Sequence, residues 1–239
     1  YDAATTLIEM KQYKRSSQLL EQFRRDYPNH KLNSGINEKL ALIYSETGQS
    51  GRAAREMEKM AAANFASNKK YSGDLLWQSA TYYEKARNHK DAQRVYAQYI
   101  KTHPYPLDRS MEARHKLAEY ARQRGDSRAW GQWLQDIIRA DARGGSQRTN
   151  RTSFLAADAT LKLAAGKHAV YKRTRLGHPL KSTLKNKKTL LQTTIKAYET
   201  AIQYRVAEVT TSATYQIGEL YRDFARSLMT SSPPPGLRG

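Results

Sequence analysis

The chain has 239 residues, of which 39% are hydrophobic and 26% are charged, and its mean hydropathy is −0.82. It contains no cysteine, which excludes disulfides, cysteine-ligated zinc and thiol catalysis. The formal net charge of +19, from 41 basic and 22 acidic residues, favours acidic partners over basic ones.

The first part of the chain predicts two pairs of short helices. The first pair covers residues 1–10 and 14–27 and is ended by Pro28, because proline cannot donate the helical hydrogen bond. The second pair begins near Ser34, turns at Gly48 and is followed by a polar segment, residues 64–73, that we expect to be a loop. No apolar run approaches the roughly 18 residues of a membrane span.

Two further pairs follow in the same pattern. The third, residues 75–104, is the best formed and ends at Pro104. The fourth begins near Leu107 and turns at residues 124–126. A small residue opens the second helix of every pair, and the separations between these residues are 37, 39 and 37: Ser16, Ala53, Ala92 and Ala129. Such a period predicts an all-α solenoid, in which each helix pair buries its apolar face only against its neighbours.

The residues at the recurring positions resemble the tetratricopeptide repeat. Its pattern is Leu-Gly/Ala-x-x-Tyr, then Gly, Ala, an aromatic residue, a small residue and Pro, and the matching residues here are Leu40, Ala41, Tyr44, Gly48, Ala53 and Met57 in one pair and Ala80, Tyr83, Ala92, Tyr96 and Pro104 in the next. Residues Ile217, Gly218 and Tyr221 match the first half again. The resemblance implies a right-handed α-α superhelix of helical hairpins, with four hairpins in residues 1–140 and the first of them truncated.

Residues 141–205 depart furthest from this pattern. They carry 14 basic and 3 acidic side chains, and two long helices are expected on either side of the breaker Gly177-His178-Pro179. Residues 206–239 are expected to begin a further unit with one helix, ended by Ser232-Pro233-Pro234-Pro235-Gly236. Because the chain opens at Tyr1 within a helical pattern, we expect it to be part of a longer protein that continues the solenoid.

No acidic residue lies between Asp158 and Glu199, whereas ten basic residues do. Clustered cations gain affinity for a polyanion by releasing its counterions, so a patch is predicted at Lys172, Arg173, Arg175, Lys181, Lys185, Lys187 and Lys188. Aromatic residues are sparse there and no groove-reading motif is present, which argues against nucleic acid. A contact with an acidic protein, or a solvated pair of basic helices, is the alternative interpretation.

By the family resemblance, a partner would bind the concave face, which is lined by the first helix of each pair. That assigns Asp74, Trp77, Thr81, Glu84 and Lys85 in the third pair and Met111, Arg114, Ala118 and Arg122 in the fourth. Trp77, Thr81, Lys85, Arg114 and Arg122 form the predicted site, with an acidic peptide as one candidate ligand. The family members that grip a terminal carboxylate have Asn where Thr81 and Ala118 stand, so that activity is not carried over. The alternative is a solvated face with local ion pairs.

Catalysis is not expected. The six histidines show no metal-ligand spacing and no glycine-rich phosphate loop follows a strand, so neither a metal nor a cofactor is predicted. The leading hypothesis is a protein-interaction scaffold or adaptor within a larger assembly, and the alternative is a polyanion-binding module acting through residues 162–196. The helix ends FRRDYP and YIKTHP resemble repeats of bacterial envelope proteins, which implies a periplasmic location.

Overall fold

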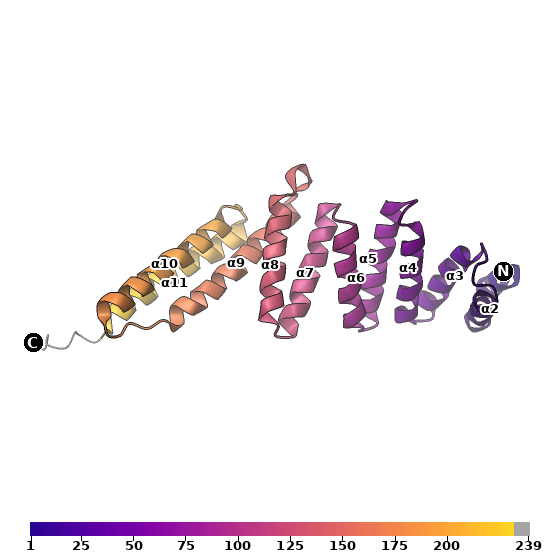
Figure 1. Cartoon of the computed structure of the whole chain (residues 1–239), viewed down its shortest axis with the longest axis horizontal. Coiled ribbons are helices and arrows are strands. Elements are labelled where there is room, and N and C mark those ends of the chain that lie inside the picture. Colours follow the sequence, from indigo (N-terminus) through magenta and orange to yellow (C-terminus); the bar gives the residue numbers. More distant parts are fainter. Residues whose placement is uncertain (232–239) are drawn as a thin grey trace, which may run out of the picture. The chain divides into compact units, whose positions relative to one another are not determined.

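The computed structural model describes residues 1–231, and every element in that range is helical (Figure 1). The predicted all-α class is therefore confirmed for this part of the chain. The elements are α1 (Asp2–Glu9), α2 (Tyr13–Asp26), α3 (Asn33–Glu46), α4 (Ser50–Asn64), α5 (Lys69–Lys85), α6 (His89–Thr102), α7 (Leu107–Gln123), α8 (Ser127–Ala142), the 3-10 turn η1 (Gly145–Gln147), α9 (Asn150–Arg173), α10 (Leu180–Ile202) and α11 (Ala207–Met229). The expected Pro-rich end at 232–236 lies outside the described residues.

The chain divides into two compact units, one from Tyr1 to Pro104 and one from Tyr105 onward. In unit 1, helices α1 to α6 pack in series, each against the next. The predicted small positions Ser16, Ala53 and Ala92 are fully buried there, because small side chains let neighbouring helices approach closely. Serial packing of helix pairs is the arrangement that the repeat period predicted.

Buried serines join neighbouring helices of unit 1. The hydroxyl of Ser16 donates to the carbonyl of Ala4 at 2.8 Å, and that of Ser79 donates to the carbonyl of Ala54 at 3.0 Å. Both serines are fully buried, so each hydroxyl finds its hydrogen bond within the protein. The helix contacts of unit 1 are thus polar at defined points as well as apolar.

A tyrosine, a glutamate and an arginine recur as a group in unit 1. The hydroxyl of Tyr83 in α5 donates to Glu58 of α4 at 2.6 Å, and Arg94 of α6 binds the same carboxylate at 2.7 Å. One repeat earlier, Glu21 of α2 accepts hydrogen bonds from Tyr44 of α3 and from Arg52 of α4. Burial and the adjacent carboxylate raise the pKa of both tyrosines. In each group the arginine comes from the helix that follows the tyrosine.

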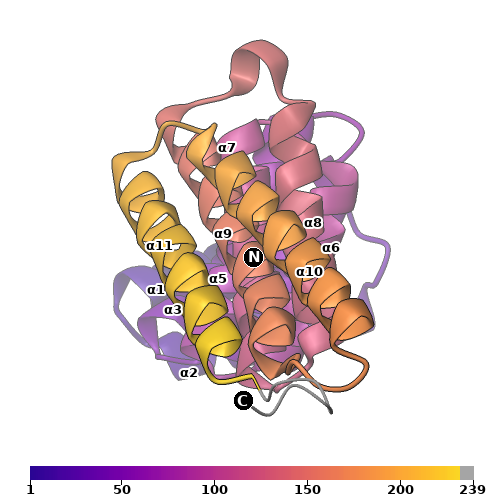
Figure 2. The same cartoon turned by 90° about the vertical axis from the view of Figure 1, so that its left-hand side faces the viewer.

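Unit 2 contains α7 to α11, which also pack in series. In addition, α9 contacts both α7 and α11, so these three helices share one layer, and α8 and α10 belong to the other. Figure 2 shows α9, α10 and α11 running alongside one another. With 24, 23 and 23 residues, these helices are longer than the 14 to 17 residues of α2 to α8.

Capping residues mark the starts of α5 and α9 in the structure. The expected loop over 64–73 is wrong, since α5 begins at Lys69: Asn68 caps it by accepting a hydrogen bond from the amide of Tyr71. Thr149 and Thr152 form a capping box at the start of α9. Gly48 and Gly125 have a φ of +73°, which glycine adopts without strain, and each follows a helix as predicted for Gly48.

Candidate functional site

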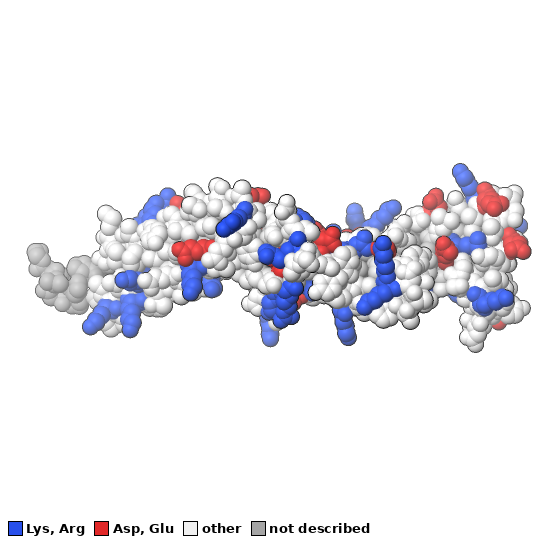
Figure 3. Space-filling view, turned by 90° about the horizontal axis from the view of Figure 1, so that it is seen from above, with Lys and Arg blue, Asp and Glu red and all other residues white. Residues whose placement is uncertain are grey.

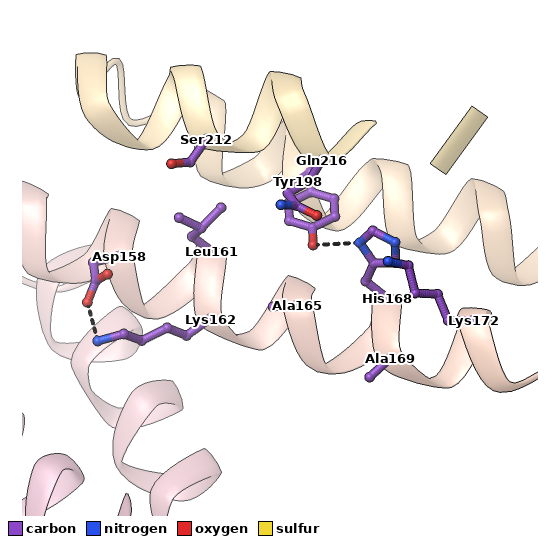
Figure 4. A pocket seen from close by; sticks show the side chains of 10 residues that line it. All are labelled: Asp158, Leu161, Lys162, Ala165, His168, Ala169, Lys172, Tyr198, Ser212 and Gln216. Atoms are coloured by element: carbon purple, nitrogen blue, oxygen red, sulfur yellow. Dashed lines mark hydrogen bonds and ion pairs between the residues drawn. The ribbon is translucent and has the colours of Figure 1, made fainter. Parts of the chain in front are cut away.

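A hollow with chemically varied walls lies in unit 2. It is a groove of about 530 Å³ between α9 and α11, with Tyr198 of α10 at its base (Figure 4). Leu161, Ala165 and Ala169 follow one another at intervals of four on α9, which places them on one stripe of the helix. Because two of the three are alanines, the stripe leaves room beside it. Ser212 and Gln216 line the groove from α11.

His168 is the most unusual group in the groove wall. Its side chain is 4% exposed, and its Nδ1 lies 3.1 Å from the hydroxyl of Tyr198. Its Nε2 is buried and has no hydrogen-bond partner in the protein. In one tautomer Nε2 is an unpaired acceptor and in the other an unpaired donor, so either form leaves a buried polar atom without a hydrogen bond.

Burial also determines the charge of His168. Desolvation lowers the pKa of this imidazole below 6.5, the nearby Lys172 lowers it further, and Asp223 and Glu219 oppose the change. The ring is therefore neutral at pH 7. A neutral imidazole offers one donor and one acceptor, which suits a hydroxyl, an amide or a carbonyl better than an anion.

Each lysine of the groove lies within ion-pair distance of a carboxylate. Lys162 binds Asp158 at 2.7 Å and reaches to 3.9 Å from Glu119 of α7, and Lys172 lies 3.7 Å from Asp223. Opposite charges thus alternate along the rim above an apolar floor. Such a groove can take an uncharged segment with a small apolar side chain and one polar group.

The residues predicted on the concave face of α5 lie outside this groove. In α5, the ring of Trp77 packs edge-on against Tyr96 and Tyr99 of α6, with centroids 5.4 and 5.7 Å apart, so it contributes to the packing of a helix pair. Thr81 donates to the carbonyl of Gln78, while Lys85 is exposed above the ring of Tyr82.

Several residues that were predicted to line the concave face from α7 are too buried to form an open wall. Met111 and Ala118 are 0% and 1% exposed and belong to the core, so their assignment to an open wall is wrong. The side chain of Arg114 is 12% exposed and binds Asp136 of α8 at 2.7 Å. Arg122 is exposed and pairs with Glu119. The family resemblance placed Met111 and Ala118 on an open face, whereas both side chains face the core.

The predicted basic patch is present in part. Lys172, Arg173, Arg175, Lys181, Lys185 and Lys188 are exposed and lie at or beside the turn from α9 to α10, which we call the basic turn. In Figure 3 several blue side chains lie at the left-hand end of the view, and others lie along the rest of this face. Lys187 does not belong to the patch.

Lys187 is 3% exposed, and its ammonium donates to the carbonyl of Thr174 at 2.7 Å and lies 4.4 Å from the centroid of the Tyr171 ring. Burial lowers its pKa. Lys187 is buried because it lies four residues before the buried Leu191, on the same side of α10.

Sequence reasoning missed the groove. His168 is one of the six histidines whose spacing predicts no metal site, and no motif marks Tyr198. The available signal was that both fall on the buried faces of their helices, where a polar ring requires a partner. Within residues 1–231, no cluster of three metal-ligating side chains occurs, and no helix there is long and apolar enough to cross a membrane.

Comparison with known proteins adds little to this description. No protein-family model matches the chain, and no curated protein matches it. A solved structure described as "Computational Design of Self-Assembling Cyclic Protein Homooligomers" is similar to it, with 14% identity and a TM-score of 0.21 over 95% of this chain and 85% of that one. What the fold itself establishes is an all-α, repeat-like array of helix pairs that is compatible with an interaction scaffold.

Proposed function

We propose that this chain is a protein-interaction scaffold built from tetratricopeptide-like helix pairs, and that the α9–α11 groove holds a short segment of a partner protein. The unpaired Nε2 of the buried His168 carries the proposal. A buried polar atom without a partner costs about 1–3 kcal/mol, and a ligand that supplies the missing hydrogen bond recovers that cost.

The shape and charge of the groove narrow the class of ligand. Its floor of Leu161, Ala165 and Ala169 suits a small apolar side chain. Lys162 is already paired with Asp158, so an isolated anion gains less there than at the exposed Lys185 and Lys188 of the basic turn. The proposed ligand is a peptide with a small apolar residue next to a hydroxyl, amide or backbone carbonyl that reaches His168.

A displayed library of random 12-residue peptides provides the test. The library is selected on the wild-type chain, and the enriched peptides are titrated against Ala165→Arg, which fills the groove from an exposed position of α9. The matched control is Gln135→Arg, which adds the same charge at an exposed position of α8. We expect at least about a tenfold loss of affinity for Ala165→Arg alone. Equal binding of the selected peptides to both variants would exclude the groove as their binding site.

A polyanion-binding function is the second candidate, and the exposed cations of the basic turn favour it. Reversing Lys185 and Lys188 to Glu, while leaving the buried Lys187 intact, separates the two functions. If the basic turn is the site, affinity for heparin falls with this variant and with rising salt, by about one power of salt concentration for each neutralised charge. Ala165→Arg should leave heparin binding unchanged.

A further inference from the structure

The outer face of α10 carries a straight row of cations. Helix α10 packs against α9 and α11, and its buried side chains, among them Lys187, Leu191 and Tyr198, lie on the side of those two helices. On the opposite side, exposed residues follow one another at intervals of four, three, four and four, which places them on one line along the helix. We call this line the α10 stripe, and it consists of Lys181, Lys185, Lys188, Gln192 and Lys196. At the helical rise, the stripe is about 22 Å long.

The lysines of the α10 stripe have no acidic partner in the part of the chain that the structure describes. No carboxylate of residues 1–231 forms an ion pair with them, and Glu199, the one acidic residue of α10, lies beyond the end of the stripe. Lys162 and Lys172 of α9, by contrast, each lie within ion-pair distance of an aspartate. Like charges four residues apart on a helix repel one another, as Lys181 and Lys185 do. A ligand with negative charges along the stripe would relieve this repulsion.

A second row of polar groups runs beside the α10 stripe. The residue after each of its first four members is exposed and carries a hydroxyl or an amide: Ser182, Asn186, Thr189 and Thr193. The hydroxyls of Ser182, Thr189 and Thr193 donate to backbone carbonyls of the preceding turn, at 3.0, 3.0 and 3.1 Å. A hydroxyl has one proton and two lone pairs, so these exposed oxygens remain available as hydrogen-bond acceptors. The face therefore offers cations in one row and acceptors in the next.

The two rows distinguish among polyanions. The phosphate backbone of DNA can pair with the lysines but has no proton to donate to the hydroxyl oxygens. Single strands are held by stacking on aromatic side chains, and α10 exposes none. A helix that lies on an anionic membrane needs an apolar face, and none of the exposed large hydrophobic residues within 1–231 belongs to α10. A sugar chain with carboxylate or sulfate groups supplies both the anions and the hydroxyl donors.

We propose that the outer face of α10 is a binding surface for a linear acidic polysaccharide. The acidic groups of the polysaccharide lie along the α10 stripe, and its hydroxyls donate to the oxygens of Thr189 and Thr193. This inference rests on the second candidate function, polyanion binding, and names the class of polyanion. A repeating ligand suits such a surface, because contacts that are weak singly add up along one chain. The surface is separate from the groove, which α10 lines with Tyr198 from its buried side.

Matched oligomers test the class of ligand. A fluorescent oligogalacturonate, which carries a carboxylate and free hydroxyls on every sugar, is titrated against the full chain by fluorescence anisotropy at low salt. An oligoglutamate with the same number of carboxylates but no hydroxyls is the comparison. We expect the sugar to bind at least about fivefold more tightly. Equal affinities, or stronger competition by a DNA or RNA oligonucleotide or by phosphatidylglycerol vesicles at equal charge concentration, would overturn the proposal.

Substitution of the lysines tests the cation row. The double variant Lys185→Gln with Lys188→Gln should bind oligogalacturonate at least about tenfold more weakly, and its salt dependence should fall by about one power of salt concentration for each removed charge. The matched control is Lys90→Gln, which removes an exposed lysine of α6 and should leave binding unchanged.

Substitution of the threonines tests the acceptor row. Thr189→Val with Thr193→Val keeps the shape of both side chains but removes their oxygens, so oligogalacturonate should bind about fivefold more weakly while oligoglutamate binds as before. Thr211→Val of α11 is the matched control, because Thr211 is also exposed and its hydroxyl donates to the carbonyl of Ala207 four residues earlier. It should have no effect on either ligand.

The outcomes separate this inference from the function on which it rests. If no polyanion binds, or if the lysine variant binds as the wild type does, both the polysaccharide assignment and the polyanion-binding function are wrong. If the lysine variant weakens binding and the threonine variant does not, polyanion binding stands and the polysaccharide assignment is overturned. Ala165→Arg, which lies in the groove, should change neither result, so the proposed peptide site is judged independently.

Discussion

The Nδ1 of His168 and the hydroxyl of Tyr198 lie 3.1 Å apart in the interior of unit 2, joining α9 to α10. Their rings meet edge to face at an interplanar angle of 84°, and both residues are almost fully buried. This pair fixes the orientation of the imidazole and therefore the direction in which Nε2 points.

Replacing Tyr198 with phenylalanine should destabilise the protein. The variant keeps the ring but removes the hydroxyl, so the buried Nδ1 also loses its partner, at a cost of about 1–3 kcal/mol in the free energy of unfolding. Urea denaturation monitored by circular dichroism measures it. Tyr215→Phe, which alters an exposed tyrosine, is the matched control and should change stability by less than about 0.5 kcal/mol. Equal effects would mean that the hydrogen bond contributes nothing.

Stability should fall as the solution becomes more acidic than about pH 6.5. Burial lowers the pKa of His103, His115 and His168 in the folded chain, so the unfolded chain binds more protons once the pH falls through the ordinary value of 6.5. The full contribution is present above that pH and is lost below it, by at most about 1.4 kcal/mol per pH unit for each histidine.

Urea denaturation at a series of pH values between about 5 and 8 measures this slope. His168→Phe should reduce it, because that variant lacks one of the three titrating groups. Identical slopes for the variant and the wild type would contradict the proposed desolvation of His168.

Replacing Lys187 with methionine should loosen the turn between α9 and α10. The methionine keeps most of the apolar stem but removes the ammonium that donates to the carbonyl of Thr174, a loss of about 1.5–3 kcal/mol for a hydrogen bond to a charged group. Lys188→Met changes the neighbouring, exposed lysine and should have little effect. Hydrogen exchange of the first turns of α10 and thermal unfolding measure the difference, which would vanish if Lys187 were solvated.

Two glycine-to-alanine substitutions should have opposite effects. At Gly218 a methyl group meets nothing, so the better helix propensity of alanine should stabilise the chain by about 1 kcal/mol. At Gly73 of α5 a Cβ would lie 2.8 Å from Cδ2 of the buried His103, so overpacking should cost about 1–3 kcal/mol. Differential scanning calorimetry compares them, and a stabilised Gly73→Ala would show that the His103 ring moves aside freely.

The repeat period and the prolines that end helices could be identified from the sequence alone. Ser16, Ala53 and Ala92 are fully buried, as the repeat register requires, and α2 and α6 each end two residues before a proline, at 28 and 104. These features depend on residues close together in the chain: a proline stops a helix and a small residue permits contact with the next one. Ala129, at the fourth position, is only partly buried, so the register weakens toward the basic segment.

By itself, then, the sequence determined that the chain folds into helix pairs, that prolines 28 and 104 end two of them, and that its positive charge concentrates in one segment. Only the tertiary structure decided which side of each helix faces a neighbour. That choice buries Met111, Ala118 and Lys187, leaves Tyr215 and Tyr221 exposed, and sets His168 beside Tyr198. The physical reason is that helical periodicity fixes the faces of one helix, whereas the use of each face depends on which helices pack against it.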